Sequence, residues 1–280
     1  MPSQGRIHNL TSGRNRGVPC ARGHEGSRFF SSCTRQSRNA VLSKASRTID
    51  LKHFINHELL APNVLTVPVD MEIVGEFADL ARSEGMQPGY YSLAPWPGIS
   101  DIRWISALSM AKFDLFQSAF DRLNIAQHVR QYLDIENDVR FYTGFLHIRK
   151  KCKESNMHVD WQLTNNEGFT IIIPIYGLEN LPRLIYRKLT GEIAEYTYKY
   201  GEGILFGDHF IHSTPAEELD SPLALLVFNF GTDKMEHWDK LKRTQARQCP
   251  LVRLPNGEMI RVDPCAKTGP EVRATVLTNE

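Results

Sequence analysis

The feature that most constrains the fold is a series of short hydrophobic segments in the second half of the chain. After Asp138 the apolar residues recur at about every second position, and Gly, Pro, Asn and Asp separate the segments. Side chains alternate between the two faces of a strand, so this spacing indicates strands rather than helices. We expect strands over Val139–Ile148, Phe169–Tyr176, Leu181–Arg187, Ile193–Tyr200, Gly203–Phe206 and Leu223–Phe230. Many short strands joined by turn residues predict an all-β sandwich or barrel, including the jelly rolls.

Helices are expected before this strand-rich region. Apolar residues recur at spacings of three and four over Met71–Ser83, and again from Asp101 to about Leu133. These spacings predict two helices that buttress the sheet, the second capped by Ser100 or Asp101. Residues 90–98, where prolines flank a tryptophan, are expected to form a loop.

The sequence indicates one domain behind an N-terminal leader. No repeat of fixed period and no second change of composition divides the 280 residues. We therefore expect a fold that is mainly β with N-terminal helices. Its expected parts are a helical buttress (49–137), a β-barrel core (138–232), a C-terminal helix and hairpin (233–265) and a flexible tail (266–280).

Residues 1–48 form the leader and differ from the rest of the chain. They contain nine Lys and Arg residues, a single acid, Glu25, and many Ser and Gly residues. Such a segment buries too little apolar surface to order itself, so we expect disorder. An Arg-rich, acid-poor N-terminus is typical of a transit peptide, and Arg28-Phe29-Phe30-Ser31 resembles a mitochondrial processing site. We expect a mitochondrial location, with a plastid or cytoplasmic one as the alternative.

Charge and cysteine content exclude several classes of protein. The chain has 33 basic and 32 acidic residues, so its overall charge favours neither a nucleic acid nor a membrane partner. No stretch has the 18 or more consecutive apolar residues typical of a membrane-spanning helix. The five cysteines are widely spaced and include no C-x-x-C pair, which argues against a disulfide framework or a zinc ribbon. We expect reduced thiols, with a Cys249–Cys265 bridge as the alternative.

Two short motifs carry the residues most suited to chemistry. Phosphate-binding glycine loops and the G-x-S-x-G elbow of serine hydrolases are absent from the sequence. His158 and Asp160 stand just before a predicted strand, and His212 follows in Gly207-Asp208-His209-Phe210-Ile211-His212. Residues i and i+2 of an extended segment point to the same side, so His158 and Asp160 can face one interior. Two histidines and a carboxylate on one face of an ion suit non-haem Fe(II), although the same donors also suit Mn or Zn.

This arrangement resembles the Fe(II)/2-oxoglutarate-dependent dioxygenase superfamily. The resemblance rests on the H-x-D motif, the short strands after it and the segment 203–208 that leads to the distal histidine, and it covers about residues 138–232. It implies a double-stranded β-helix, which is a jelly-roll or cupin-like barrel. It also implies that His158, Asp160 and His212 bind Fe(II), with 2-oxoglutarate and O₂ in the remaining positions. The implied reaction produces succinate and CO₂ and hydroxylates a small molecule or a protein side chain.

The sequence departs from the superfamily at the residue that holds 2-oxoglutarate. The family usually has an Arg or Lys about ten residues beyond the distal histidine, but no basic residue lies between His212 and Lys234. A buried dicarboxylate without a cation is costly, so another residue is expected to compensate. Our candidates for binding the cosubstrate are Arg183 and Arg187, with Arg149 in reserve.

Other interpretations of these residues stay open at this stage. His209 is an alternative to His212 as the distal ligand, and His158 with Asp160 also fits a polar pair on the surface of a sheet. The missing basic residue favours a cupin-type metalloenzyme that does not use 2-oxoglutarate. A third possibility is a non-catalytic barrel that serves as a binding module.

Overall fold

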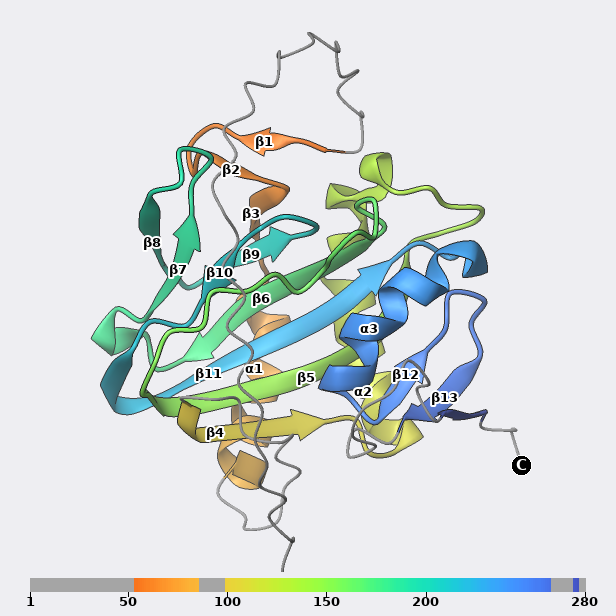
Figure 1. Cartoon of the computed structure of the whole chain (residues 1–280). Coiled ribbons are helices and arrows are strands. Elements are labelled where there is room, and N and C mark those ends of the chain that lie inside the picture. Colours follow the sequence, from red (N-terminus) through yellow and green to blue (C-terminus); the bar gives the residue numbers. More distant parts are fainter. Residues whose placement is uncertain (1–52, 86–98, 263–273, 277–280) are drawn as a thin grey trace, which may run out of the picture. The chain divides into compact units, whose positions relative to one another are not determined.

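Two antiparallel sheets pack against each other in the computed structural model (Figure 1). The structure describes residues 53–85, 99–262 and 274–276, all within Thr48–Glu280, the second of the two units into which the chain divides. In the major sheet, the strands follow the order β3 (Val64–Pro68), β9 (Glu202–Phe206), β6 (Gly168–Tyr176), β11 (Glu217–Gly231), β5 (Arg140–Cys152) and β4 (Ile99–Ser106). The minor sheet consists of β10 (His212–Ser213), β7 (Arg183–Arg187) and β8 (Ile193–Thr197).

Alternation along the strands divides the core into two apolar layers. On β11, Leu225 and Val227 belong to the cluster between the two sheets, whereas Leu226 and Phe228 belong to the cluster under the helices. Because both faces of the strand are covered there, residues 223–228 are apolar at every position instead of every second one. The layer between the sheets also contains Leu184 of β7. This inner layer surrounds the candidate site described below.

Two helices cover the outer face of the major sheet, behind it in the view of Figure 1. They are α1 (Met71–Gly85) and α2 (Met110–Arg122). The helices meet through Phe77 and Phe116, whose ring centroids lie 5.3 Å apart. Gly144 of β5 lets α2 approach closely, since a Cβ there would lie 2.9 Å from Phe116. The α2 N-cap is Ser109, whose hydroxyl accepts a hydrogen bond from the amide of Lys112.

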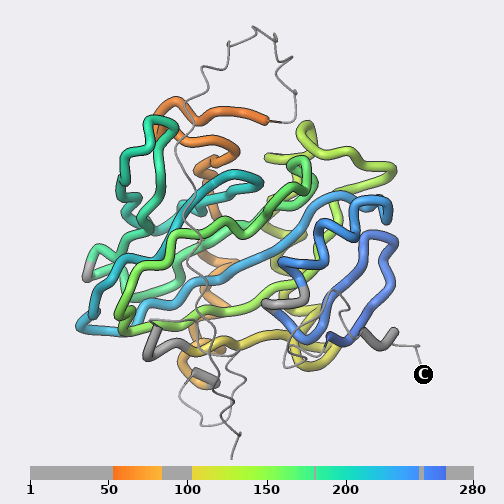
Figure 2. Tube along the Cα trace, viewed as in Figure 1, coloured from red at the N-terminus to blue at the C-terminus, as the bar shows by residue number. Residues whose placement is uncertain are grey.

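The C-terminal segment packs over one end of the sheet, where α3 stands in front of the strands (Figure 1). It contains α3 (Trp238–Gln248), β12 (Leu251–Arg253), β13 (Met259–Val262) and β14 (Ala274–Val276). The remaining short elements are β1 (Ile55–Asn56), β2 (Ala61–Pro62), η1 (Ile125–His128), η2 (Arg130–Tyr132), η3 (Leu178–Asn180) and η4 (Met235–His237). The path of the chain through these elements is traced in Figure 2.

Most of the expected elements form, with two corrections. All six core strands, the first helix and the C-terminal hairpin are confirmed. The helix expected from Asp101 is wrong at its start, because residues 99–106 form β4 and the helix begins only at Met110. Part of the tail expected to be flexible, residues 274–276, forms β14 and pairs with β13. The expectations for residues 1–48 and 90–98, and for Cys265, lie outside the described residues.

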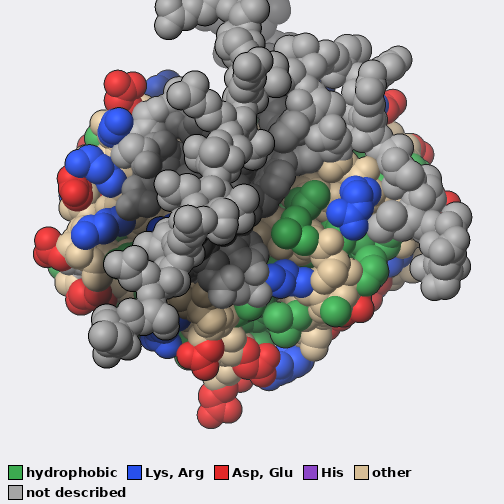
Figure 3. Space-filling view, turned by 90° about the horizontal axis from the view of Figure 1, so that it is seen from below, with side chains coloured by type: hydrophobic (Ala, Val, Ile, Leu, Met, Phe, Trp, Pro, Cys, Tyr) green, Lys and Arg blue, Asp and Glu red, His purple; other side chains and the backbone are tan. Residues whose placement is uncertain are grey.

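The described part of the surface carries charges of both signs. Acidic and basic side chains lie side by side on the face seen from below, with hydrophobic side chains between them (Figure 3). None of the helices in the described ranges is long and apolar enough to cross a membrane. Cys152 and Cys249 are both buried and free.

Candidate metal centre

The two histidines of the motifs are brought together by direct backbone pairing. His158 forms an isolated antiparallel bridge with His212, the first residue of β10. The amide of each residue donates to the carbonyl of the other at 2.9 Å. Their ring centroids lie 4.6 Å apart. The pairing therefore fixes the separation of two residues that are far apart in the sequence.

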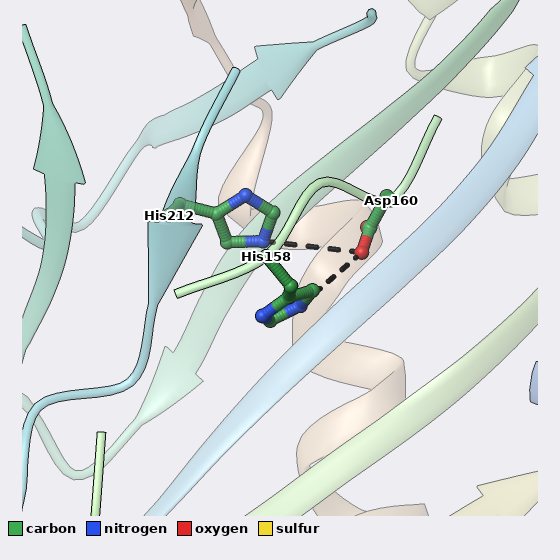
Figure 4. Close-up of side chains that lie close together, drawn as sticks. All are labelled: His158, Asp160 and His212. Carbon is green, nitrogen blue, oxygen red and sulfur yellow. Dashed lines mark ion pairs between the residues drawn. The ribbon is translucent and has the colours of Figure 1, made fainter. Parts of the chain in front are cut away.

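Asp160 completes a group of three potential ligands. Its Oδ1 atom lies 3.5 Å from Nε2 of His158 and 3.9 Å from Nε2 of His212 (Figure 4). The three donor atoms all lie within 4.8 Å of one another. Adjacent donors at about 2.1 Å from a common ion would be about 3 Å apart, so a small closure suffices to hold one. The donor set and its spacing fit a divalent transition metal.

Each imidazole forms a hydrogen bond through Nδ1, which leaves Nε2, the nitrogen nearer Asp160, for a metal. Nδ1 of His158 lies 2.7 Å from the carbonyl oxygen of Asn156, and Nδ1 of His212 lies 3.1 Å from that of Phe210. A carbonyl only accepts, so in the neutral ring each Nδ1 carries the proton and Nε2 keeps its lone pair. Both lone pairs are thus on the side of Asp160.

The surroundings favour a neutral His212 and an ionised Asp160. For His158, burial would lower the pKa, but the hydrogen bond to Asp160 and the charge of that carboxylate raise it above its ordinary value. Burial lowers the pKa of His212 to about 4, although the charge of Asp160 opposes the shift. Burial would raise the pKa of Asp160, but the hydrogen bond from His158 and the charges of both imidazoles bring it below its ordinary value. Near neutral pH, His212 is therefore neutral and Asp160 is ionised, as ligation requires.

The hydroxyl of Thr170 contacts the carboxylate of Asp160, and two further side chains contact that hydroxyl. The hydroxyl of Thr170 on β6 lies 3.2 Å from Oδ2 of Asp160 and 2.9 Å from Oδ1 of Asn229 on β11. The hydroxyl oxygen of Thr170 accepts a hydrogen bond from Nε1 of Trp161 at 2.9 Å. The backbone carbonyl of Asp160 also accepts from the hydroxyl of Thr244 on α3. The sequence analysis missed this use of Thr170, because a strand threonine has no local signal for the partner it meets.

A second buried carboxylate joins the two loops that carry the ligands. Asp208 accepts from the hydroxyl of Thr164 at 2.6 Å and from the amide of Asn165 at 2.9 Å. Leu163, Asn165 and Asn166 have positive φ angles, a conformation that costs energy unless other contacts maintain it. Asp208 thus ties the loop after Asp160 to the loop before His212. In the sequence, the Asn165-Asn166 pair indicates a turn, but nothing indicates that Asp208 is its partner.

A cavity of about 100 Å³ opens beside the triad between the two sheets. All three potential ligands line it. Its other walls are mainly apolar and include Phe145, Ile172, Leu184, Leu225 and Val227. Trp104 of β4 and His147 of β5 add polar atoms to the wall, and their rings stack with centroids 5.2 Å apart. The arrangement provides one metal position with adjoining space for small organic ligands.

Other candidate residues lie elsewhere. His209 is exposed and its ring faces His53 at 5.5 Å, not the triad. Arg183 is 40% exposed and donates to both carboxylate oxygens of Glu195. Arg187 is exposed as well. On β7 the even-numbered residues point inward, so neither arginine lines the cavity.

Arg149, by contrast, lies on the inner face of β5. Its side chain is 1% exposed, and Nη2 donates to Oε1 of Glu217 at 3.0 Å. Its Nε and Nη1 atoms are buried and have no hydrogen-bond partner among the described residues.

A further group of potential ligands lies outside the cavity wall. It consists of Asp134, Glu167 and His237, whose donor atoms also lie within 4.8 Å of one another. Lys234 is ion-paired with Asp134 at 2.5 Å, so this group already has a cation beside it. The His158, Asp160 and His212 triad is the better candidate because it adjoins a cavity.

Comparison with known proteins identifies the fold. No protein-family model matches the sequence, and no curated protein matches it. Among solved structures, the chain resembles SnoN, a non-heme alpha-ketoglutarate-dependent epimerase from nogalamycin biosynthesis. The TM-score is 0.50 at 11% identity, over 61% of this chain and 78% of SnoN. The expected double-stranded β-helix is confirmed.

Two further structures give weaker matches. HygX from Streptomyces hygroscopicus, solved with nickel and 2-oxoglutarate bound, has a TM-score of 0.45 at 12% identity, covering 64% of this chain and 88% of HygX. A Pseudomonas putida prolyl-4-hydroxylase has a TM-score of 0.44 at 14% identity, covering 61% and 92%. At such identities the likeness concerns the fold alone.

Proposed function

We propose that this protein is an Fe(II)- and 2-oxoglutarate-dependent dioxygenase that hydroxylates a small molecule or a protein side chain. The observation that carries the proposal is the convergence of His158, Asp160 and His212 at a cavity between the sheets. Three ligands on one side leave adjacent positions of an ion open, which is the arrangement that non-haem oxygen chemistry uses.

The residues of the chain have distinct tasks in this proposal. His158, Asp160 and His212 would hold the metal, and Thr170 would keep the carboxylate of Asp160 oriented. The bound metal and cosubstrate supply the oxidising chemistry. The apolar walls would exclude water and position the substrate beside the stacked rings of Trp104 and His147.

The test is an anaerobic titration of the whole chain. Adding Fe(II) and 2-oxoglutarate together should produce a weak visible absorption band that neither produces alone, and admitting air should yield succinate. Asp160→Ala should lose the metal and the band. Asp220→Ala, which removes an exposed carboxylate of β11, is the matched control and should keep both. A metal-loaded protein that shows no band with 2-oxoglutarate contradicts the proposal.

A cupin-type enzyme without 2-oxoglutarate is the second candidate. It is favoured by one feature, the lack of a basic residue on β11 between His212 and Gly231. In that case the metal would bind with unchanged affinity whether or not 2-oxoglutarate is present. Calorimetric titration of the metal in both conditions separates the two candidates.

We also propose that the protein is mitochondrial. What supports this is the composition of residues 1–48, with nine basic residues and one acid, and the Arg28-Phe29-Phe30-Ser31 segment. A fluorescent protein fused behind residues 1–48 should enter mitochondria, and mass spectrometry should find a mature N-terminus near Phe30. A diffuse fusion with an intact N-terminus contradicts the proposal.

A further inference from the structure

The three potential ligands of the triad differ in how their backbones are held. His158 and His212 exchange two backbone hydrogen bonds, which fix these two residues relative to each other. Asp160 lies outside every helix and strand, and in the described part of the chain its amide and carbonyl take part in no backbone–backbone hydrogen bond. The backbone of Asp160 must therefore be held by contacts of another kind.

One such contact comes from α3, the helix in front of the strands in Figure 1. The hydroxyl of Thr244 donates a hydrogen bond to the backbone carbonyl oxygen of Asp160. Thr244 is only 8% exposed, so water has little access to this bond. A threonine inside a helix often donates to a carbonyl one turn earlier in its own helix. Because a hydroxyl has a single hydrogen to donate, Thr244 uses it to join α3 to a potential metal ligand.

The residue that follows Asp160 is held by the same C-terminal segment. The ring of Trp161 is fully buried in an apolar cluster whose other buried members are Tyr142, Leu241, Val252, Leu254, Ile260 and Val262. Strand β6 also comes close to this ring, since a Cβ at Gly168 would lie 2.5 Å from it. The peptide group between Asp160 and Trp161 is therefore restrained at its oxygen by Thr244 and at the next side chain by this cluster.

Metal binding depends on the direction in which the carboxylate of Asp160 projects. Donor atoms around one ion must keep their distances to it within about 0.2 Å. Thr170 contacts Oδ2 and so restrains the side chain of Asp160, but this contact does not fix the backbone that carries the side chain. The hydrogen bond from Thr244 acts on that backbone. The two contacts are thus separate restraints on one ligand.

We propose that Thr244 is a positioning residue for the metal centre, because its hydrogen bond to the carbonyl of Asp160 keeps this ligand directed at the position that His158 and His212 share. The inference rests on the proposed function, since it takes the triad as the metal site. The C-terminal segment is then part of the support of the metal centre. By linkage, a bound metal must in turn stabilise the packing of α3.

The test removes the hydroxyl and follows the metal rather than turnover. Thr244→Val keeps the shape of the side chain but removes the donor. The dissociation constant for Mn(II), measured by calorimetry under nitrogen on the full chain, should rise about 10-fold, as is typical when a group that orients a ligand is lost. The visible absorption bands of the Co(II)-loaded protein, which report the coordination geometry, should change as well. Thr244→Ser keeps the hydroxyl and should restore both.

Thr143→Val is the matched control. Thr143 is a fully buried threonine whose hydroxyl donates to the backbone carbonyl of Leu251, so it also joins the C-terminal segment to the sheet. It forms no hydrogen bond with Asp160 among the described residues. Both valine variants should unfold at a lower urea concentration than the wild type, but only Thr244→Val should change the Mn(II) affinity and the Co(II) spectrum. Unchanged Mn(II) affinity in Thr244→Val, or an equal loss in Thr143→Val, overturns the inference.

The wild type alone carries the test if Thr244→Val does not fold. Zn(II) should slow amide hydrogen exchange in α3 more than in α1, which covers the outer face of the major sheet. An equal gain of protection in the two helices overturns the inference. A wild type that binds neither Mn(II) nor Co(II) contradicts the proposed function itself, and the inference fails with it.

Discussion

The hydroxyl group of Thr170 links the carboxylate of Asp160 to Trp161 and to β11. Thr170 contacts Asp160 and Asn229 and accepts from Trp161. Thr170→Val keeps the shape but removes the hydroxyl, so Asp160 loses the group that contacts its Oδ2 atom and Trp161 loses its acceptor. We expect metal affinity to fall about 10- to 100-fold, as for other residues that orient ligands, with the fold retained.

Competitive titration with a metal-sensitive dye measures the effect, and circular dichroism checks the fold. Thr170→Ser keeps the hydroxyl and should restore most of the affinity. Equal affinity in wild type and Thr170→Val would show that Asp160 is held without this contact.

At the level of residues, the sequence identifies the three potential ligands that the structure brings together, but not the groups that support them. His158 and Asp160 carry a local signal because a spacing of two puts both on one side of an extended segment. The same rule, applied to Arg183 and Arg187, says that they share a face but not which face. The structure shows that Leu184 between them points inward, so both arginines point to solvent. Only the paired strands decide the face, and for that reason the sequence could not show that Arg149, the reserve candidate, is the buried one of the three arginines.

Among the elements, the loop that follows the H-x-D motif depends on Asp208. Its carboxylate accepts from Thr164, Asn165 and Asn166, three consecutive residues of a loop with positive φ angles. Asp208→Ala leaves these buried donors unpaired. We expect the free energy of unfolding to fall by about 2–4 kcal/mol, from hydrogen bonds to a charged acceptor. Metal affinity should fall as well, because Asp208 joins the loops of both motifs that contain the potential ligands.

Urea unfolding of the metal-free chain measures the first effect, and metal titration the second. Asp220→Ala, at an exposed carboxylate, serves as the control and should change neither. If Asp208→Ala lowers stability but leaves metal affinity as in the wild type, then Asp208 stabilises the barrel and does not position the metal-binding side chains.

The strand β4 shows why one element was predicted with the wrong type. Trp104 faces the cavity and Ile105 faces the helices, so consecutive residues are both apolar. Burial on both faces removes the alternation that identifies a strand. The residues after β4 form α2 and have a helical spacing. The sequence-based prediction extended this helix backwards over β4. The core strands were predicted because several have at least one polar or half-buried face, as β7 and β8 do.

For the molecule as a whole, His147 makes stability depend on pH. Burial lowers its pKa to about 3, with a further contribution from the charge of Arg149. Between pH 3 and the ordinary value of 6.5, the unfolded chain binds a proton at this histidine and the folded chain does not. Stability therefore rises with pH through this window and is complete above it.

His147→Phe removes this titration while keeping an aromatic ring to stack on Trp104. Between pH 6.5 and pH 5 the wild type should lose up to about 2 kcal/mol of unfolding free energy more than the variant, since each pH unit is worth 1.36 kcal/mol. Urea unfolding of both metal-free proteins at pH 5, 6.5 and 8 measures the difference. Above pH 6.5 the two proteins should differ by a constant amount, whatever the packing cost of the ring. If wild type and variant lose equal unfolding free energy down to pH 5, His147 takes up a proton as readily in the folded protein as in the unfolded chain. That outcome would require water or an acceptor at Nε2, which the buried position of this atom opposes.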